Sequence, residues 1–460
     1  MLHTDALRAQ SAPRPERLRP TRNHPPPKSH LPMLDIRYVV NHEAAVAANV
    51  KARNAKADVG ALVALYKRRN LVLSELETTR AQANASAKAM QGKMAPEERQ
   101  QRIEHGRALK LRVAQLETET EALQVELDAA LRTLPNLTHP EAPLGHTDDD
   151  HRELRRWGKP RDWAFTPLDH VQLAEKLDLV DFEAGAKVAG QKFYFLKNEL
   201  VLLDLALQRF AVERLLAHGF TPMVTPDLAR PAILEGIGFN PRGEETQVYS
   251  VAGHDLCLVG TAEITIGGMF ADQIFQPGQL PLRIAGISHC FRTEAGAGGR
   301  ESRGLYRVHQ FTKVEMFIFC DGDVAVSDPH HAELLAIEEE LFQALEIPYR
   351  VLDICSGDLG APAYRKFDIE AWMPGRGVYG EVTSTSNCTD FQARRLGIRH
   401  YPQEGAKARP VHTLNGTAIA LSRGLIAILE NHQEADGSVA MPAALWPYLP
   451  FRRIGPRATT

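Results

Sequence analysis

The sequence predicts an α+β fold, in which an antiparallel sheet is flanked by helices and preceded by a long helical hairpin. Three observations lead to this prediction. Leucines recur at 3-4 spacing through residues 62–130, which is typical of paired amphipathic helices. From residue 191 onward, short strand patterns follow one another without a strict βα alternation. No GxGxxG or GxxxxGK[ST] motif occurs, so nothing supports a dinucleotide-binding or P-loop fold.

The composition is that of a globular protein with room for two or three domains. The chain has 460 residues, of which 44% are hydrophobic and 24% are charged. Its net charge of −3 means that any nucleic-acid binding would depend on a local basic patch. No apolar run of about 18 residues occurs, so we expect no membrane span. The five cysteines form no CxxC pair, so we expect reduced thiols and no zinc.

Residues 1–32 are predicted to be a disordered leader rich in proline and arginine. They contain few large apolar side chains, so ordering them would bury little surface. An organellar transit peptide is one explanation. The prolines disfavour a long amphipathic helix, however, and Met33 opens the well-patterned segment MLDIRYVV. A translated leader upstream of the true start is therefore favoured.

Residues 33–140 are predicted to form a binding domain dominated by the helical hairpin. Gly92 can end one helix and Pro96 can start the next. The narrow apolar stripe on each helix favours an antiparallel coiled coil, and helices of about 30 residues would extend on the order of 45 Å. Exposed basic residues suit the backbone of a folded nucleic acid, although the interspersed acids also fit an ordinary solvated surface. The basic residues are Lys67, Arg68, Arg80, Lys88, Lys93, Arg99, Arg102, Arg107 and Arg112.

Residues 141–460 are predicted to form the catalytic domain, reached through a linker between Leu134 and His151. We expect a helix over 199–218 that Gly219 ends, and a second helix over 329–345. Strands are expected at 191–196 and 257–266, then in IPYRVLDI, RKFDIEAWM and GVYGEVTSTSN. The last segment, 414–433, passes from small residues into an amphipathic helix.

A strand, a glycine-rich loop and a return strand are predicted from His289 to Glu315. Glycines at 296, 298, 299 and 304 exclude a regular element in the loop, and residues 305–312 alternate with a strand period. Arg292 and Glu294 precede the loop, and Glu315 ends the return strand. These groups could hold a phosphate, a polar ligand and a flat ring, but an ordinary hairpin with surface ion pairs fits them too.

Other polar residues would join this hairpin if the strands lie side by side. Arg292 and Arg423 suit phosphate groups, because a guanidinium can bind two oxygens at once. Glu381 and Ser384 offer oxygen ligands of the kind that magnesium prefers. Phe311 offers a ring face for a base. The hydroxyls and carboxylates that suit a compact ammonium ligand are Thr261, Glu263, Glu315 and Thr417.

Several segments resemble the seryl-tRNA synthetases, a family of class II aminoacyl-tRNA synthetases, from Met33 to about Pro450. GFTPMVTPDL, FRTEAGAGGRESRGLYRVHQFTKVE and LNGTAIALSRGLIAILEN resemble the three class II motifs. TAE at 261–263 and TSTSNCTDFQARR at 383–395 point to this family in particular. FRTE and EVTS stand where FRSE and EISS are usual, and the leader has no counterpart.

The resemblance implies a class II catalytic domain with helices around an antiparallel sheet, and an N-terminal coiled-coil arm that binds tRNA. It implies that Arg292 grips the α-phosphate, Glu294 reads the adenine amino group and Arg423 reaches the terminal phosphate. The implied ATP site is Arg292, Thr293, Glu294, Val308, Phe311, Glu381, Val382, Thr383, Ser384 and Arg423, with Mg²⁺ on Glu381 and Ser384. The implied serine pocket is Thr261, Ala262, Glu263, Arg292, Glu315, Asn415 and Thr417. The implied catalytic residues are Arg292, Glu294 and Arg423.

The expected activity is that of a serine–tRNA ligase acting on L-serine, ATP and tRNA(Ser), and on tRNA(Sec) where it is present. We expect a homodimer without membrane contact in the cytoplasm, with a mitochondrial or plastid matrix as the alternative. We expect no general base, and structural roles for His289 and His309. Two rivals remain: a ligase that charges a carrier protein, and a non-catalytic tRNA-binding protein. The arm argues against the first, and the set of ATP residues against the second.

Overall fold

The computed structural model describes residues 34–90, 94–239, 247–295 and 304–456. Some sequence predictions fall outside the described residues. They concern the leader 1–32, Gly92 and Lys93 of the arm, and Gly296, Gly298 and Gly299 of the loop. Over the described ranges, no helix combines the length and the apolar character needed to cross a membrane.

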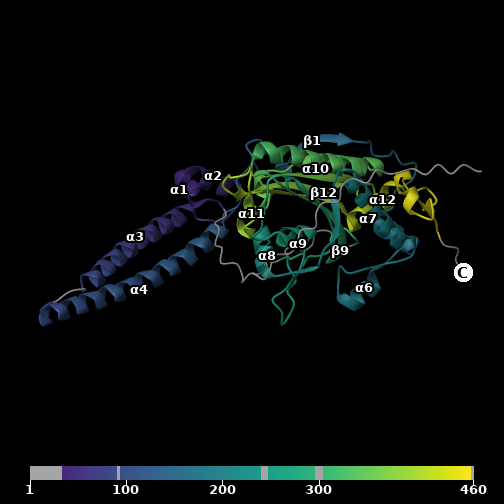
Figure 1. The fold of residues 1–460 in the computed structure, drawn as a ribbon. Coiled ribbons are helices and arrows are strands. Elements are labelled where there is room, and N and C mark those ends of the chain that lie inside the picture. The colour runs from purple at the N-terminus through teal and green to yellow at the C-terminus, as the bar shows by residue number, and fades with distance from the viewer. Residues whose placement is uncertain (1–33, 91–93, 240–246, 296–303, 457–460) are drawn as a thin grey trace, which may run out of the picture.

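Two long antiparallel helices dominate the N-terminal part, as predicted. Short helices α1 (Ile36–Asn41) and α2 (Glu43–Ala52) precede α3 (Val59–Ala89) and α4 (Pro96–Arg132). The Asp58 side chain caps the start of α3. Pro96 lies in the first turn of α4, where its missing N–H needs no partner. Figure 1 shows α3 and α4 projecting side by side from the rest of the molecule, which we call the body.

A leucine stripe and three ion pairs join the two arm helices. The buried residues of α4 keep the coiled-coil spacing, and they are Leu109, Leu116, Leu123, Leu127 and Leu131. The ion pairs are Arg68–Glu119 at 3.2 Å, Arg80–Glu117 at 2.7 Å and Arg112–Glu75 at 2.5 Å. Three basic positions predicted to face a nucleic acid are thus paired between the two helices, and a further one, Arg102, pairs with Glu98 of its own helix at 2.8 Å. Four others have no ion pair with any described residue: Lys67, Lys88, Arg99 and Arg107.

The segment predicted as a linker, 134–151, is packed against the body instead of running free. Leu134 and Asn136 are buried. The backbone N–H of Asn136 donates to the Ala361 carbonyl, and that of His139 donates to the Tyr364 carbonyl, both at 2.9 Å. The segment is thus a linker, as predicted, and these backbone hydrogen bonds attach it to the body.

An eight-stranded sheet forms the centre of the body, in the order β1-β10-β11-β12-β15-β9-β8-β4. Its strands are β1 (Arg152–Trp157), β4 (Thr221–Val224), β8 (Leu282–Phe291), β9 (Gln310–Cys320), β10 (Tyr349–Asp353), β11 (Arg365–Met373), β12 (Val378–Thr389) and β15 (His412–Ala420). All pairs are antiparallel except edge strand β4 with β8, which is parallel. The predicted α+β class with an antiparallel sheet is confirmed.

Helices cover both faces of this sheet (Figure 1). One face carries α7 (Glu199–Ala217), α10 (Val324–Ala344) and α12 (Leu421–Asn431), with α5 (His170–Lys176) beside α12. The other carries α8 (Pro231–Ile237), α9 (Ala262–Met269) and α11 (Phe391–Leu396). The smaller elements are α6 (Phe182–Ala189), β2 (Val180–Asp181), β3 (Phe195–Leu196), β5 (Leu228–Ala229), β6 (Cys257–Leu258), β7 (Ile274–Phe275), β13 (Arg399–His400), β14 (Arg409–Pro410), β16 (Val439–Ala440), β17 (Arg453–Ile454) and the 3-10 helices η1 (Asp148–Asp150), η2 (Ser356–Asp358) and η3 (Ala443–Tyr448).

Three predicted strands need correction. The stretch 257–266 is the two-residue strand β6 followed by helix α9, which the Thr261 side chain caps. The return strand of the hairpin begins at Gln310, so residues 305–309 are not strand and Glu315 lies in the middle of β9. The strand expected over 191–196 is confined to β3. In addition, α10 begins at Val324, before Pro329.

Strand β9 is buried on both faces, which explains why its alternation is weak in the sequence. Val314, Met316 and Ile318 belong to the hydrophobic cluster beneath α7, α10 and α12. Phe317 and Phe319 belong to the cluster beneath α8 and α9. Since both sets are apolar, the strand shows a nearly continuous hydrophobic run. The interruptions by Lys313 and Glu315 therefore mark a site within the core.

Candidate active site

The base of the β8–β9 hairpin places Arg292 beside Phe311. The Arg292 N–H donates to the His309 carbonyl at 3.0 Å, and His309 Nδ1 donates to the Arg292 carbonyl at 2.8 Å. Phe193 stacks on the His309 ring with centroids 5.3 Å apart. The Arg292 guanidinium lies 5.4 Å from the Phe311 ring centroid. A cation and a ring face are thus presented together to one cleft, and His309 has a structural role, as expected.

Glu381 of β12 and Arg423 of α12 form the opposite wall of this cleft. Arg423 Nη1 lies 3.0 Å from Glu381 Oε1 and donates to the Glu381 carbonyl at 3.0 Å. The Tyr306 hydroxyl donates to the same carbonyl, and its ring lies 4.7 Å below the Arg423 guanidinium. Burial raises the pKa of the Glu381 carboxyl, but the charges of Arg423, Lys366 and Arg292 together outweigh it, and the pKa lies below its usual value.

The cleft between these walls has a volume of about 470 Å³. The predicted residues that line it are Arg292, Glu294, Val308, Phe311, Glu381, Val382, Thr383, Ser384, Thr417 and Arg423. The other predicted site residues lie outside this lining: Thr261, Ala262, Glu263, Thr293, Glu315 and Asn415. The structure therefore brings the ATP set together, with the exception of Thr293, whose N–H donates to the Gln247 carbonyl at 3.2 Å.

Two of the remaining predicted residues, Glu263 and Asn415, belong to a group of hydrogen-bonded side chains in the interior, which we call the Glu263 cluster. Its members are Glu263, Gln392, Thr413, Asn415 and Cys388. Glu263 Oε1 accepts from Gln392 Nε2 at 2.6 Å and from Asn415 Nδ2 at 2.9 Å. Thr413 Oγ1 donates to Gln392 Oε1 at 2.7 Å, which orients that amide. Burial and the nearby Glu315 raise the pKa of Glu263 to about 7.

Glu315 lies between the Glu263 cluster and the cleft. Its Oε2 lies 2.5 Å from Lys313 Nζ and accepts from Thr417 Oγ1 at 3.1 Å. Lys313 and Thr417 both line the cleft, so this pair links the cleft to the cluster. At the start of α9, the Thr261 hydroxyl accepts from the Glu263 N–H at 3.4 Å, and the Ala262 side chain packs towards Gly286 of β8. A small ligand here would meet carboxylates, an ammonium and hydroxyls.

The residues on the Glu381 side suit a magnesium ion. Glu381 and Ser384 both line the cleft, and cross-strand pairing sets Asp368 opposite Ser384. The buried Asp368 Oδ1 accepts no hydrogen bond from the described part of the chain. Carboxylate and hydroxyl oxygens are the ligands that magnesium prefers, usually together with water and phosphate. The donor set therefore fits a metal ion that accompanies a nucleotide.

Comparison with known proteins assigns the family. The seryl-tRNA synthetase N-terminal domain model matches residues 33–138, and the class II core domain model for the tRNA synthetases of G, H, P, S and T matches residues 247–432. A serine–tRNA ligase of Treponema denticola is 53% identical over 92% of this chain and 100% of its own length. The chain belongs to the seryl-tRNA synthetase family. A serine–tRNA ligase of Rubrobacter xylanophilus is 55% identical over 92% of this chain and 99% of its own.

Solved structures of the family share the whole architecture. The seryl-tRNA synthetase of Pyrococcus horikoshii, complexed with ATP, superposes with a TM-score of 0.86 at 40% identity. It is matched over 93% of this chain and 100% of its own. The cytoplasmic serine–tRNA ligase of Naegleria fowleri, in complex with AMP, gives a TM-score of 0.81 at 30% identity, over 92% and 97% of the two chains. The arm and the class II catalytic fold are therefore both confirmed.

Sequence reasoning missed several residues that line the cleft, which are Tyr306, Arg307, Lys313, Ala420 and Ser422. Lys313 could have been found, because it shares the two-residue period of Phe311 and Glu315. Arg307 could have been found less easily, since its ion pair with Glu294 at 3.5 Å depends on the course of the loop. Tyr306 has no local pattern that distinguishes it from a core tyrosine.

Proposed function

We propose that the protein activates L-serine with ATP and transfers the seryl group to the 3′ end of tRNA(Ser). The observation that carries this proposal is that the cleft joins a cation-and-ring wall to a buried carboxylate cluster through Lys313, Glu315 and Thr417. One end suits a nucleoside triphosphate, and the other suits a compact hydroxy amino acid. We propose that tRNA(Sec), where it is present, is charged with serine in the same way.

For ATP, we infer that Phe311 stacks on the adenine and Arg292 binds the α-phosphate, with Glu294, Thr293 and Val308 beside the base. Arg423 lies where it can receive a terminal phosphate. Arg423 and Glu381 form an ion pair at 3.0 Å. Glu381 and Ser384 would hold magnesium, which screens the charge of the phosphates when bound. The triphosphate and its metal would thus each replace one partner of this ion pair.

For serine, we infer that the polar hydrogens of the amino acid bind Glu263, Glu315 and Thr417, while Arg292 contacts the carboxylate. Attack of that carboxylate on the α-phosphorus forms the adenylate, and pyrophosphate leaves. The tRNA ribose hydroxyl then attacks the seryl carbonyl of the adenylate, AMP leaves, and the hydroxyl proton passes to a phosphate oxygen of the departing AMP. Positioning and charge neutralisation accelerate such a transfer without a protein base.

The arm supports binding of a folded RNA. Lys67, Lys88, Arg99 and Arg107 have no ion pair with a described residue, so their charges are available to phosphates. The arm also argues against the rival that charges a carrier protein, because such a ligase has no need of it. The assembled ATP residues argue against the non-catalytic rival.

We further infer a homodimer that forms through α7 and the edge strand β4. Leu202, Leu205 and Leu216 are exposed on α7, and Val224 on β4 is 82% exposed. Leu205 and Leu216 are eleven residues apart, about three helical turns, so they share one face. Apolar side chains gathered beside a sheet edge are typical of an interface. We propose a cytoplasmic location, and keep the matrix of an organelle as the alternative.

Serine-dependent exchange of pyrophosphate into ATP tests the activity. The wild-type protein should exchange with L-serine and with no other member of a panel of amino acids. Arg292→Ala should lower the rate by more than about a hundredfold, since it removes a contact to the reacting phosphate. Arg156→Ala, an exposed ion-pair arginine on β1, is the control. Exchange with another amino acid but not with serine would refute the proposal, and absence of seryl transfer to total tRNA would favour the carrier-protein rival.

A further inference from the structure

A β-bulge at Cys388 brings the N-terminal part of the chain into contact with the Glu263 cluster. In the pairing of β12 with β15, Asn387 lies opposite Leu414 and Thr389 lies opposite Thr413. Cys388 is the extra residue between them. Thr389 has a φ of 44°, which is unusual for a β-branched side chain. A bulge of this kind turns a side chain in a new direction, and surrounding contacts must hold it.

The carbonyl and the thiol of Cys388, in the central strand β12, have different partners. Its carbonyl accepts from Asn136 Nδ2 at 2.9 Å. Its thiol accepts from Asn415 Nδ2 at 3.5 Å, and the same amide group donates to Glu263 Oε1 at 2.9 Å. A single residue of β12 thus separates Asn136, which directly follows the arm, from the carboxylate proposed to bind serine.

The Asn136 side chain makes further hydrogen bonds around the bulge. Its Nδ2 also donates to the Pro362 carbonyl at 2.9 Å and to Thr389 Oγ1 at 3.0 Å. The side chain is buried, with 3% of the residue exposed. The strained Thr389 is therefore held by the same amide as the Cys388 carbonyl. Without that amide, the buried Cys388 carbonyl would lose this donor. Because an unpaired buried acceptor is costly, we expect the bulge to shift.

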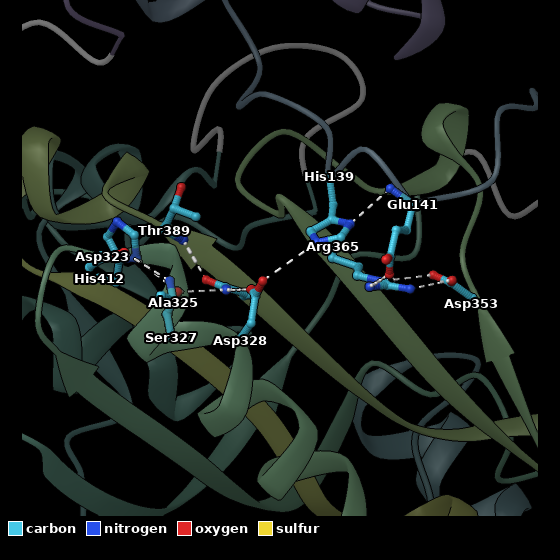
Figure 2. A network of polar contacts seen from close by, with 11 residues as sticks. His139, Glu141, Asp323, Ala325, Ser327, Asp328, Asp353, Arg365, Thr389 and His412 are labelled. Atoms are coloured by element: carbon cyan, nitrogen blue, oxygen red, sulfur yellow. Dashed lines mark hydrogen bonds and ion pairs between the residues drawn. The ribbon is translucent and has the colours of Figure 1, made fainter.

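The segment after Asn136 holds the bulge from a second side. The Thr389 N–H donates to Asn387 Oδ1 at 2.9 Å, and Asn387 Nδ2 donates to Asp328 Oδ1 at 2.9 Å. His139 Nε2 lies 3.6 Å from Asp328 Oδ2. Figure 2 shows this series from His139 through Asp328 to Thr389. The Glu141 N–H also donates to His139 Nδ1 at 3.0 Å, whereas the Glu141 side chain pairs with Arg365, outside the series.

Asn136 is itself anchored to the N-terminal helices. Asn49 of α2 donates to the Asn136 carbonyl at 3.0 Å and accepts from the Thr138 N–H at 3.0 Å. Arg53 donates to the Ala363 carbonyl at 2.8 Å, and burial lowers the pKa of this guanidinium to about 10. The hydrogen bonds thus run without interruption from α2 to the bulge.

We propose that Asn136 is a positioning residue for serine recognition: by holding the bulge at Cys388, it fixes Asn415 and through it Glu263. The proposal rests on the proposed function of the Glu263 cluster. On this proposal, serine activation requires the base of the N-terminal part, namely α2 and the segment around Asn136. It does not require the distal parts of α3 and α4. Asn136 contacts neither ATP nor serine, so its effect should be confined to the amino acid.

Steady-state pyrophosphate exchange without tRNA tests this proposal on the full chain. Asn136→Ala and Asn136→Asp should each raise KM for serine by about tenfold, the second because a carboxylate then faces three oxygen acceptors. KM for ATP should stay within twofold. Alkylation of Cys388 by iodoacetamide, followed by mass spectrometry, should be at least five times faster in both variants. Glu141→Gln, which removes another polar contact of the same segment, should change none of these values.

A milder variant keeps the test decisive if the Asn136 variants fold poorly. Asn49→Ala leaves the Cys388 carbonyl paired but frees Asn136 on the α2 side, and should raise KM for serine about threefold. Unchanged KM for serine in the folded variants would overturn the proposal, as would equal increases for serine and ATP, which indicate general destabilisation. If the wild-type protein shows no serine-dependent exchange, the proposed function itself fails, which is a different result.

Discussion

Ionisation of Glu263 should control the capture of serine. Burial and the charge of Glu315 raise the pKa of Glu263 to about 7 from 4.5, against opposing contributions from Gln392, Lys313 and Arg292. Such a shift corresponds to about 3 kcal/mol for ionising the side chain in the empty pocket. Since the serine ammonium group can only donate and carries a positive charge, the ionised carboxylate binds serine more tightly than the protonated one. Catalytic efficiency with serine should therefore rise with pH through about 7.

The size of the effect follows from the fraction that is ionised. At pH 6 about one tenth of Glu263 carries a charge, so kcat/KM for serine in pyrophosphate exchange should be about tenfold below its plateau. The pH profile of kcat/KM for ATP should not show this rise through about pH 7. Glu263→Gln keeps the shape but loses a hydrogen bond to a charged group, so kcat/KM should fall by about 10- to 150-fold and no longer vary near pH 7.

The same shift affects stability with a defined sign. Because the folded state keeps the proton up to about pH 7 and the unfolded chain loses it near 4.5, the free energy of unfolding should decrease as pH rises across this window. Glu263→Gln should remove that decrease, while Asp204→Asn, a buried carboxyl outside the cluster, should leave the serine profile unchanged. A kcat/KM for serine that does not change from pH 5.5 to 8 would refute the role of Glu263. A rise near pH 7 that persists in Glu263→Gln would refute it too.

Three further predictions concern the arm and the metal. Deleting the distal arm, residues 70–117, keeps the buried Leu62, Val63 and Leu127 of its base and should leave serine activation within about twofold but reduce charging of tRNA at least a hundredfold, and equal loss of both would contradict the role of the arm. Arg107→Ala should lower kcat/KM for tRNA about fivefold and reduce its salt dependence, whereas Arg112→Ala, already paired with Glu75, should have a smaller effect in the same charging assay. Glu381→Gln should raise the magnesium concentration for half-maximal exchange about tenfold, and an unchanged titration would exclude Glu381 as a ligand.

Those parts of the fold that have a strong local period could be predicted from the sequence. The arm was predicted because its leucines repeat over two long helices and Pro96 marks a helix start. Strands β10, β11 and β12 were predicted because each contains β-branched and aromatic residues between turns. The residues of the cleft were predicted from their chemistry and from the resemblance, and the structure brings most of them together.

Helix α9 was mistaken for a strand because Ile264, Thr265 and Ile266 have high β-propensity. Tertiary packing decides otherwise. A Cβ at Gly267 or Gly268 would lie within 2.5 Å of Ile237 and Ile233 side chains, so only glycine lets the helix lie this close to α8. Propensity is a weak prior where packing of this kind competes with it.

The contact of Asn136 with Cys388 could not be predicted, because the two residues are 252 positions apart and neither belongs to a periodic pattern. The contact depends on a β-bulge, in which one strand has an extra residue relative to its partner. A sequence does not show where such an extra residue lies. The predicted linker does connect the N-terminal helices to the sheet, but its docking on the body could not be predicted for the same reason. A proline-rich segment and a docked extended segment have similar composition, and they differ only in where their backbone hydrogen bonds go.

The arrangement of charges explains why the site needs no dedicated general base. His309 Nδ1 donates to the Arg292 carbonyl, and His289 Nδ1 lies 2.8 Å from Asp227 Oδ2, so both rings are engaged away from the reacting groups. The attacking group is a carboxylate, which needs no proton removed, whereas its approach to a triphosphate must overcome repulsion between anions. Arg292 and Arg423 on the two walls of the cleft supply the compensating charge where it develops. Arg423 is already fixed on the wall of the cleft by Glu381 at 3.0 Å, and binding of the phosphates would exchange one anionic partner of this guanidinium for another.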